Sequence, residues 1–137
     1  MQRYIGLDVG TKRIGVALSD PLLITAQPLE AIAREPEEQS LLRIAALCKE
    51  HDVLGIVVGF PKNMNGTVGP QAEDCKTFGD KIKNMTGLEV FFEDERLTSK
   101  QAEQALALQG KKYTKNKSLV DITSAVLILQ QFLDRRS

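Results

Sequence analysis

Acidic residues stand at three distant points of this 137-residue sequence where their neighbours predict buried structure. Asp8 lies in the apolar stretch RYIGLDV, Asp94 and Glu95 end the stretch LEVFFED, and Asp121 opens an apolar helical pattern. A buried carboxylate is costly unless it is paired or binds a metal, and clustered carboxylates raise one another's pKa. The three points are therefore candidates for one shared site.

A divalent cation removes the repulsion between such carboxylates. Mg²⁺ binds a few carboxylates together with water and phosphate oxygens. Two such ions about 3.5–4 Å apart can activate a water and stabilise the leaving oxygen of a phosphodiester. The chemistry that these residue types support is metal-dependent phosphodiester hydrolysis.

Each acid also has an ordinary structural explanation. Asp8 can cap a local turn or pair with Arg13, and Asp94 and Glu95 can be solvated charges at a strand end. Asp121 can serve only as favourable charge at a helix N-terminus. Residue spacing leaves both explanations open, so the predicted elements that position these acids matter.

The first part of the chain predicts a meander of strands. Residues 3–9 and 13–19 each place apolar side chains at alternate positions, as strands do. The connection at residues 10–12 is so short that it favours an antiparallel hairpin. Residues 24–33 predict a third strand, broken near Pro28.

The pattern then predicts helix, strand, helix and strand. The first helix has Pro36 as its first residue, and residues 53–60 are an apolar run typical of a strand buried on both faces. Pro70 begins the second helix, Gly87 ends it, and LEVFFED is the following strand.

Two more helices follow. Thr98 and Gln101 form a capping box for a short helix that stops at Gly110, and Ser118 caps the last helix.

Apolar residues at helical spacing mark the buried faces of three of these helices. In the first helix they are Leu41, Ile44, Ala45 and Cys48. In the second helix they are Ala72, Cys75, Phe78, Ile82 and Met85. In the last helix they are Ile122, Ala125, Val126, Leu129, Phe132 and Leu133.

This order of elements predicts an α/β fold with a mixed central sheet and helices on both faces. Meander strands are antiparallel, whereas strands separated by a helix are most simply parallel with right-handed crossovers. If the strands of Asp8 and Glu95 are parallel, both acids lie at the carboxyl edge of the sheet, where open α/β folds bind ligands. Asp121 flanks the buried stripe of the last helix and can join them.

Composition excludes several other classes of protein. Apolar residues make up 42% and charged residues 26%, as in an ordinary globular chain, and the length suits a single domain over residues 1–137. No apolar run approaches the ~20 residues of a membrane span, and the N-terminus lacks the features of a signal peptide. Cys48 and Cys75 fall at apolar helix positions, so we expect reduced core thiols and a cytoplasmic protein.

A net charge of zero hides a basic segment. Between Gln104 and Val120 there are four lysines and no acid. Phosphate contacts need such groups, and others lie close in sequence to the predicted site. The candidate substrate-binding residues are Arg13, Lys62, Arg96, Lys111 and Lys112.

Four segments resemble the signature stretches of the YqgF family, in the family's order. They are IGLDVGTKRIGVALSD (5–20), IVVGFPKNMNGTVGPQA (56–72), EDERLTSKQAE (93–103) and KSLVDITSAVLIL (117–129). The resemblance implies an RNase H-like fold, with a five-stranded mixed sheet and helices on both faces. It also implies a nuclease centre at Asp8, Glu95 and Asp121 that holds Mg²⁺ or Mn²⁺, as two ions.

Two single residues qualify this resemblance. Alternation along the strand puts Asp94 and Glu95 on opposite faces, so only one of them should point into the site, and the family's DER motif favours Glu95. Ser124 stands where the family often has alanine, which concerns packing more than chemistry.

The family's role implies trimming of the 5′ end of pre-16S rRNA, with the small-subunit precursor as a partner. Alternatives are a Holliday junction resolvase and a non-catalytic RNA-binding module for ribosome assembly. The stretch GLDVGT also resembles the phosphate loop of actin-like ATPases, but those proteins use two such domains. Residue patterns leave open whether the chain is a monomer or a homodimer.

Overall fold

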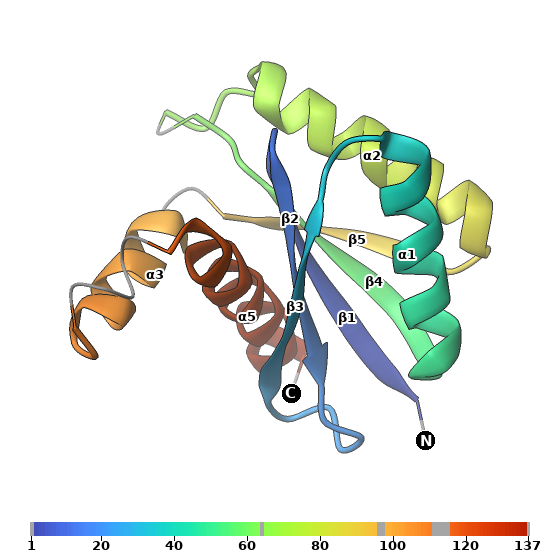
Figure 1. Cartoon of the computed structure of the whole chain (residues 1–137), viewed down its shortest axis with the longest axis horizontal. Coiled ribbons are helices and arrows are strands. Elements are labelled where there is room, and N and C mark those ends of the chain that lie inside the picture. The colour runs from blue at the N-terminus through green and yellow to red at the C-terminus, as the bar shows by residue number, and fades with distance from the viewer. Residues whose placement is uncertain (1, 64, 96–97, 111–115, 137) are drawn as a thin grey trace.

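The computed structural model describes residues 2–136, apart from residue 64, residues 96–97 and residues 111–115. Five strands form one sheet in the order β3-β2-β1-β4-β5 (Figure 1). They are β1 (Arg3–Val9), β2 (Arg13–Ser19), β3 (Ala26–Ala33), β4 (Val53–Phe60) and β5 (Glu89–Asp94). Strand β2 is antiparallel to β1 and β3, whereas β4 is parallel to β1 and β5, so the predicted mixed sheet is confirmed.

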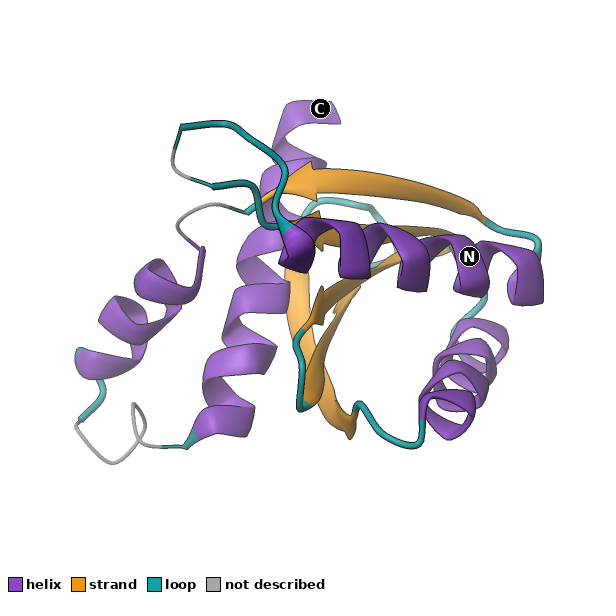
Figure 2. Ribbon diagram, turned by 90° about the horizontal axis from the view of Figure 1, so that it is seen from above, coloured by secondary structure: helices purple, strands orange, loops and turns teal. Residues whose placement is uncertain are grey.

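Helices cover both faces of this sheet, as Figures 1 and 2 show. They are α1 (Glu37–Glu50), α2 (Pro70–Thr86), α3 (Thr98–Ala107) and α5 (Lys117–Arg136). Helices α1 and α2 lie on one face and α5 on the other, with α3 packed on the outside of α5 (Figure 2). None of these described helices is long and apolar enough to cross a membrane.

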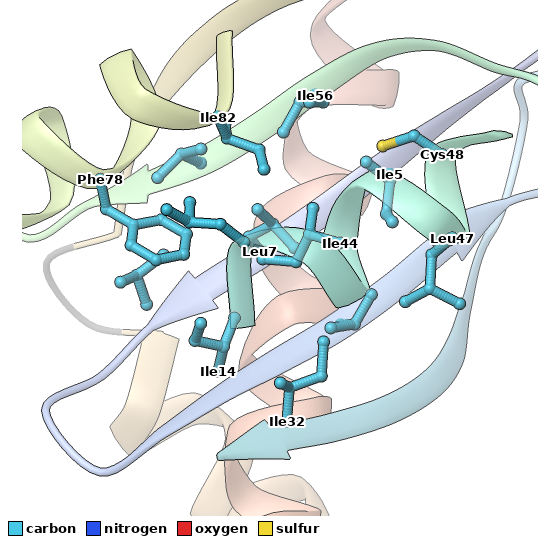
Figure 3. Close-up of a cluster of buried hydrophobic side chains, with 14 of the residues drawn as sticks. Ile5, Leu7, Ile14, Ile32, Ile44, Leu47, Cys48, Ile56, Phe78 and Ile82 are labelled. Carbon is cyan, nitrogen blue, oxygen red and sulfur yellow. The ribbon is translucent and has the colours of Figure 1, made fainter. Parts of the chain in front are cut away.

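Alternation along β1 divides the core into two layers. Ile5 and Leu7 face α1 and α2, where they pack with Ile44 and Phe78 (Figure 3). Tyr4 faces the other way and packs with the apolar side of α5. Full burial of one such side chain stabilises the fold by about 1.5–3 kcal/mol, so each layer holds its helices firmly.

The predicted break in the third strand is a bulge. Val16 of β2 pairs with Glu30 and the next residue, Ala17, pairs with Pro28, so Leu29 is an extra residue on β3. Proline has no N–H to donate to a ladder, and bulges are one of the few places where strands tolerate it. The meander is therefore continuous through Pro28.

Three predictions about helices are wrong. Pro36 is the N-cap of α1 rather than its first residue, and α3 ends at Ala107 instead of reaching Gly110. Helix α5 begins before Ser118, because the Asn116 side chain accepts a hydrogen bond from the N–H of Leu119 (3.2 Å), and asparagine is a strong N-cap.

The predicted buried faces need smaller corrections. Met85 is exposed, because it lies in the last turn of α2 beside an open pocket near Leu88. On α5, Ile122 and Val126 are only partly buried, whereas Ile128 is fully buried. The capping box predicted at Thr98 involves a side chain outside the described ones.

Candidate active site

The three predicted acids line one pocket of about 340 Å³ at the carboxyl edge of the sheet. Asp8 comes from the end of β1, Glu95 follows β5, and Asp121 lies in the first turn of α5. The β1–β2 turn forms another wall through Gly10 and Thr11. Segments that are up to 113 positions apart in sequence thus meet at one place.

The carboxyl group of Asp8 has a perturbed acidity. Its pKa is raised from 3.8 to about 6, chiefly because burial disfavours the charged form and secondly because Asp121 is negative. The neighbouring polar side chains of Glu95 and Ser124 act in the opposite direction and lower this pKa. The net effect is that the charged form of Asp8 is disfavoured in the absence of a bound cation.

Glu95 reaches this pocket because β4 has a glycine beside it. Its backbone N–H donates to the Phe60 carbonyl (3.4 Å), and its side chain is buried. A Cβ at Gly59 would lie 2.6 Å from the carboxyl carbon of Glu95, which is closer than two such atoms can approach. A larger residue at this position would force the Glu95 carboxylate to move.

Asp121 is held by close packing and by an ion pair. The Arg13 Nε donates to Asp121 Oδ2 over 2.7 Å, so the partner of Arg13 is Asp121 rather than Asp8. A Cβ at Gly15 would come within 2.0 Å of the backbone oxygen of Asp121. The first turn of α5 therefore rests directly on the backbone of β2.

Other predicted residues lie elsewhere. Asp94 and Lys62 line a neighbouring pocket instead of the carboxylate pocket, as alternation along β5 predicts for Asp94. Arg96, Lys111 and Lys112 lie outside the described residues. Within the described part of the chain, Arg13 is the predicted substrate-binding residue that contacts one of the three acids, Asp121.

The sequence interpretation missed the groups that fix the backbone just after Asp8. The Val9 carbonyl accepts hydrogen bonds from Gln71 Nε2 (3.3 Å) and Cys75 Sγ (3.4 Å), both on α2. Burial raises the pKa of the Cys75 thiol to about 12, so it stays protonated and can donate. Arg34 donates to the Gly10 carbonyl (3.0 Å).

Arg34 belongs to a second charged cluster, on the α2 side of the sheet. Its guanidinium donates to both carboxylate oxygens of Asp74 (2.9 Å each) and stacks 4.9 Å from the ring centre of Phe78. Neither residue carries a motif, and 40 positions separate them. Local sequence patterns could not have paired them.

The donor set suits a hard divalent cation. Three carboxylates are the ligand type that Mg²⁺ and similar ions take, and the raised pKa of Asp8 marks negative charge that a cation would stabilise. The fully buried hydroxyl of Ser124 acts on Asp8, yet it makes no hydrogen bond of ordinary geometry within the described residues. Among those same residues, no three acidic, histidine or cysteine side chains already converge tightly enough to form a metal cluster.

A family model described as "RuvX: Holliday junction resolvase" matches residues 2–135. The chain belongs to this family. The relationship that the YqgF-like segments indicated is therefore confirmed.

Curated relatives from several bacteria are similar over nearly their whole length and carry the name "Putative pre-16S rRNA nuclease". A protein of Streptococcus thermophilus is 49% identical, covering 97% of this chain and 98% of its own. One of Bacillus cereus is 46% identical (98% and 99%), and one of Lachnospira eligens is 44% identical (98% and 98%).

Two solved resolvases share the fold of the RuvX-family chain. RuvC of Thermus thermophilus, in complex with a Holliday junction substrate, has a TM-score of 0.62 at 15% identity and covers 99% of this chain and 96% of its own. The Fowlpox virus resolvase with Holliday junction DNA has a TM-score of 0.60 at 12% identity (98% and 99%). The predicted RNase H-like architecture is thus confirmed.

Proposed function

We propose that this RuvX-family chain is a nuclease that hydrolyses phosphodiester bonds with the help of divalent metal ions. The observation that carries the proposal is the meeting of Asp8, Glu95 and Asp121 in one pocket, with the pKa of Asp8 raised to about 6. Stability alone does not favour such an arrangement, because the acids repel one another. Binding of a cationic cofactor and an anionic phosphate at this pocket would account for the arrangement.

Asp8, Glu95 and Asp121 are the residues that would hold the metal, as Mg²⁺ or Mn²⁺ and as two ions. Bound ions of this kind supply an activated water and stabilise the leaving oxygen of a phosphodiester. Arg13 orients Asp121 through their ion pair. Lys62, at the end of β4, positions the strand by contact with a phosphate, without reading its sequence.

The substrate that we propose is the 5′ region of pre-16S rRNA, within the small-subunit precursor in the cytoplasm. Relatives 44–49% identical over nearly the full chain carry that name, which supports this choice. A Holliday junction is the second candidate, supported by the description of the family model and by the likeness to RuvC. In either case we expect 5′-phosphate and 3′-hydroxyl products, by analogy with the fold.

A side-by-side cleavage assay tests both candidates. The substrates are a pre-16S 5′-leader RNA and a synthetic four-way DNA junction, each incubated with Mn²⁺ or with EDTA. Asp8→Asn is compared with Asp80→Asn, a matched change of an exposed aspartate on α2. We expect Mn²⁺-dependent cleavage of the RNA that Asp8→Asn abolishes and Asp80→Asn leaves intact.

The other outcomes are equally informative. Cleavage of the junction alone moves the function to recombination. Full activity of Asp8→Asn contradicts the assignment of the site. Absence of cleavage with either substrate contradicts the nuclease proposal and leaves an RNA-binding module.

A further inference from the structure

A second pocket of about 520 Å³ opens next to the carboxylate pocket, where β4 and β5 end. We infer that this pocket, lined by Phe60, Lys62 and Phe92 among others, takes one unpaired base of the strand that is cut at the carboxylate pocket. The inference rests on the proposed function and adds a substrate class to it, namely a nucleic acid that is unpaired at the cleavage site.

The two pockets are neighbours along two parallel strands. Pro61 lines the carboxylate pocket, while Phe60 and Lys62 on either side of it line the second one. At the end of β5, Glu95 lines the first pocket and Asp94 the second. Adjacent residues at two chain positions thus line the two pockets, so we place a phosphate of the nucleic acid at the first pocket and its adjoining base at the second.

The second pocket offers an aromatic surface. The rings of Phe60 and Phe92 meet edge to face with centroids 5.9 Å apart. One face of Phe92 is taken by Lys76, whose Nζ lies 5.3 Å from the ring centre. Phe60 also lines a third pocket beside Val68, so its ring is accessible from two sides. Proteins recognise unpaired bases by stacking them on such rings.

The charges of the second pocket suit a base better than a second phosphate. Glu93 is buried, and its two oxygens accept hydrogen bonds from Gln131 Nε2 (2.6 Å) and from Arg135. Arg135 is thereby committed to a carboxylate. Lys62 is the other cation that lines this pocket, and its neighbour Pro61 lines the carboxylate pocket, so Lys62 suits the phosphate that joins the two nucleotides.

This arrangement favours single strands over duplexes. A base within a duplex is paired and stacked, and both interactions must be broken before it can enter a pocket. An unpaired base enters the pocket without that cost. The preferred substrate is therefore an unpaired RNA segment rather than a fully paired arm.

Equilibrium binding separates this inference from the proposed function, because it needs no cleavage. The Asp8→Asn protein is titrated, in Mg²⁺, into a labelled 12-nucleotide single-stranded RNA and into the same RNA paired with its complement. The test variant adds Phe60→Leu, which keeps apolar volume but removes the ring. The control adds Phe91→Leu, the same change on β5 and on the other face of the sheet, where the ring packs on Tyr4 and Phe132.

We expect Phe60→Leu to weaken binding of the single strand about tenfold, within the range of one base stacked on an aromatic ring. Binding of the duplex should not change, and Phe91→Leu should change neither. Lys62→Gln should lower the slope of log K against log salt concentration by about 0.7, the value for one phosphate contact with a single strand. Phe60→Leu should leave that slope unchanged.

The base pocket is wrong if Phe60→Leu and Phe91→Leu weaken binding of the single strand equally, or if Phe60→Leu weakens binding of single strand and duplex equally. Either result leaves the nuclease proposal intact. Tighter binding of the duplex than of the single strand would also contradict the base pocket alone. If the Asp8→Asn protein binds neither RNA, the base pocket and the proposed RNA substrate are both wrong.

Discussion

Two charged clusters lie on opposite faces of the sheet, beside the same β1–β2 turn, and they differ in how their charges are compensated. On the α2 side, Arg34 is buried and pairs with both oxygens of Asp74. On the α5 side, three carboxylates line one pocket, and Arg13 pairs with one of them, Asp121. Gly10 joins the clusters, since it accepts a hydrogen bond from Arg34 and lines the carboxylate pocket.

The pKa values of the acidic side chains are shifted in opposite directions in the two clusters. Hydrogen bonding to Arg34 lowers the pKa of Asp74, and hydrogen bonding to Lys81 lowers that of Glu37. Burial raises the pKa of Asp8 to about 6. The first cluster is therefore stabilised by its own ion pairs, whereas in the second the charged form of Asp8 is disfavoured, as we expect for a site that we propose to hold a cation.

Breaking the cluster of Arg34 and Asp74, called here the compensated cluster, should have the largest effect on stability. Asp74→Ala leaves Arg34 buried without its main partner, and we expect a loss of about 3–4 kcal/mol in the free energy of unfolding. Urea denaturation at pH 7 measures it, with Asp80→Ala on the same helix as the exposed control. A loss below 1 kcal/mol would show that the two clusters do not differ as described.

Asp8→Asn should raise the stability of the metal-free protein at neutral pH, whereas Asp74→Ala lowers it. The folded-state pKa of Asp8 lies above its ordinary value of 3.8, so its contribution to stability is full below pH 3.8 and is lost as pH rises through about 6. At about 1.4 kcal/mol per pKa unit, the metal-free wild type should lose at most about 3 kcal/mol relative to Asp8→Asn between pH 4 and pH 7.5. Denaturation of both proteins in EDTA across this range gives the difference, and a constant difference would contradict the raised pKa.

Gly59→Ala should disturb the carboxylate pocket at a smaller cost in stability. The added methyl would overlap the Glu95 carboxyl, and overpacking of this kind costs about 1–3 kcal/mol. Because Glu95 must shift, we expect cleavage to fall at least tenfold in a protein that still unfolds cooperatively. Rates measured alongside thermal unfolding test this, and unchanged rates would remove Glu95 from the site.

The rim of the compensated cluster should matter least. Lys81 pairs with Glu37 over 2.8 Å, but both side chains are substantially exposed, and such pairs contribute less than about 1 kcal/mol. Lys81→Met should therefore change the urea midpoint only slightly. An effect as large as that of Asp74→Ala would mean that the buried arginine is not the centre of the cluster.

Local sequence patterns predicted the sheet and the three acids because these depend on periodicity and strand order. Alternation placed Asp8 on the face opposite Ile5 and Leu7, and it separated Glu95 from Asp94. The parallel pairing of β1, β4 and β5 brings the ends of β1 and β5 to the same edge of the sheet.

Features that depend on close contacts between distant segments could not be predicted. Gly15 and Gly59 were not identified as the positions where Asp121 and Glu95 approach the sheet, since a glycine in a strand has many possible causes. The pairing of Arg34 with Asp74 depends on how α2 crosses the sheet. Helix starts also shifted, because Asn116 caps α5 in place of Ser118.

The position of Asp121 in the chain has a consequence for the order of synthesis. Helix α5 is the last described element to leave the ribosome, and it brings both the third carboxylate and the apolar side that covers Tyr4 and Val57. A nascent chain that ends before it has one bare face of the sheet and only two of the three acids. If the three acids form the active site as proposed, the same helix completes both the site and the fold.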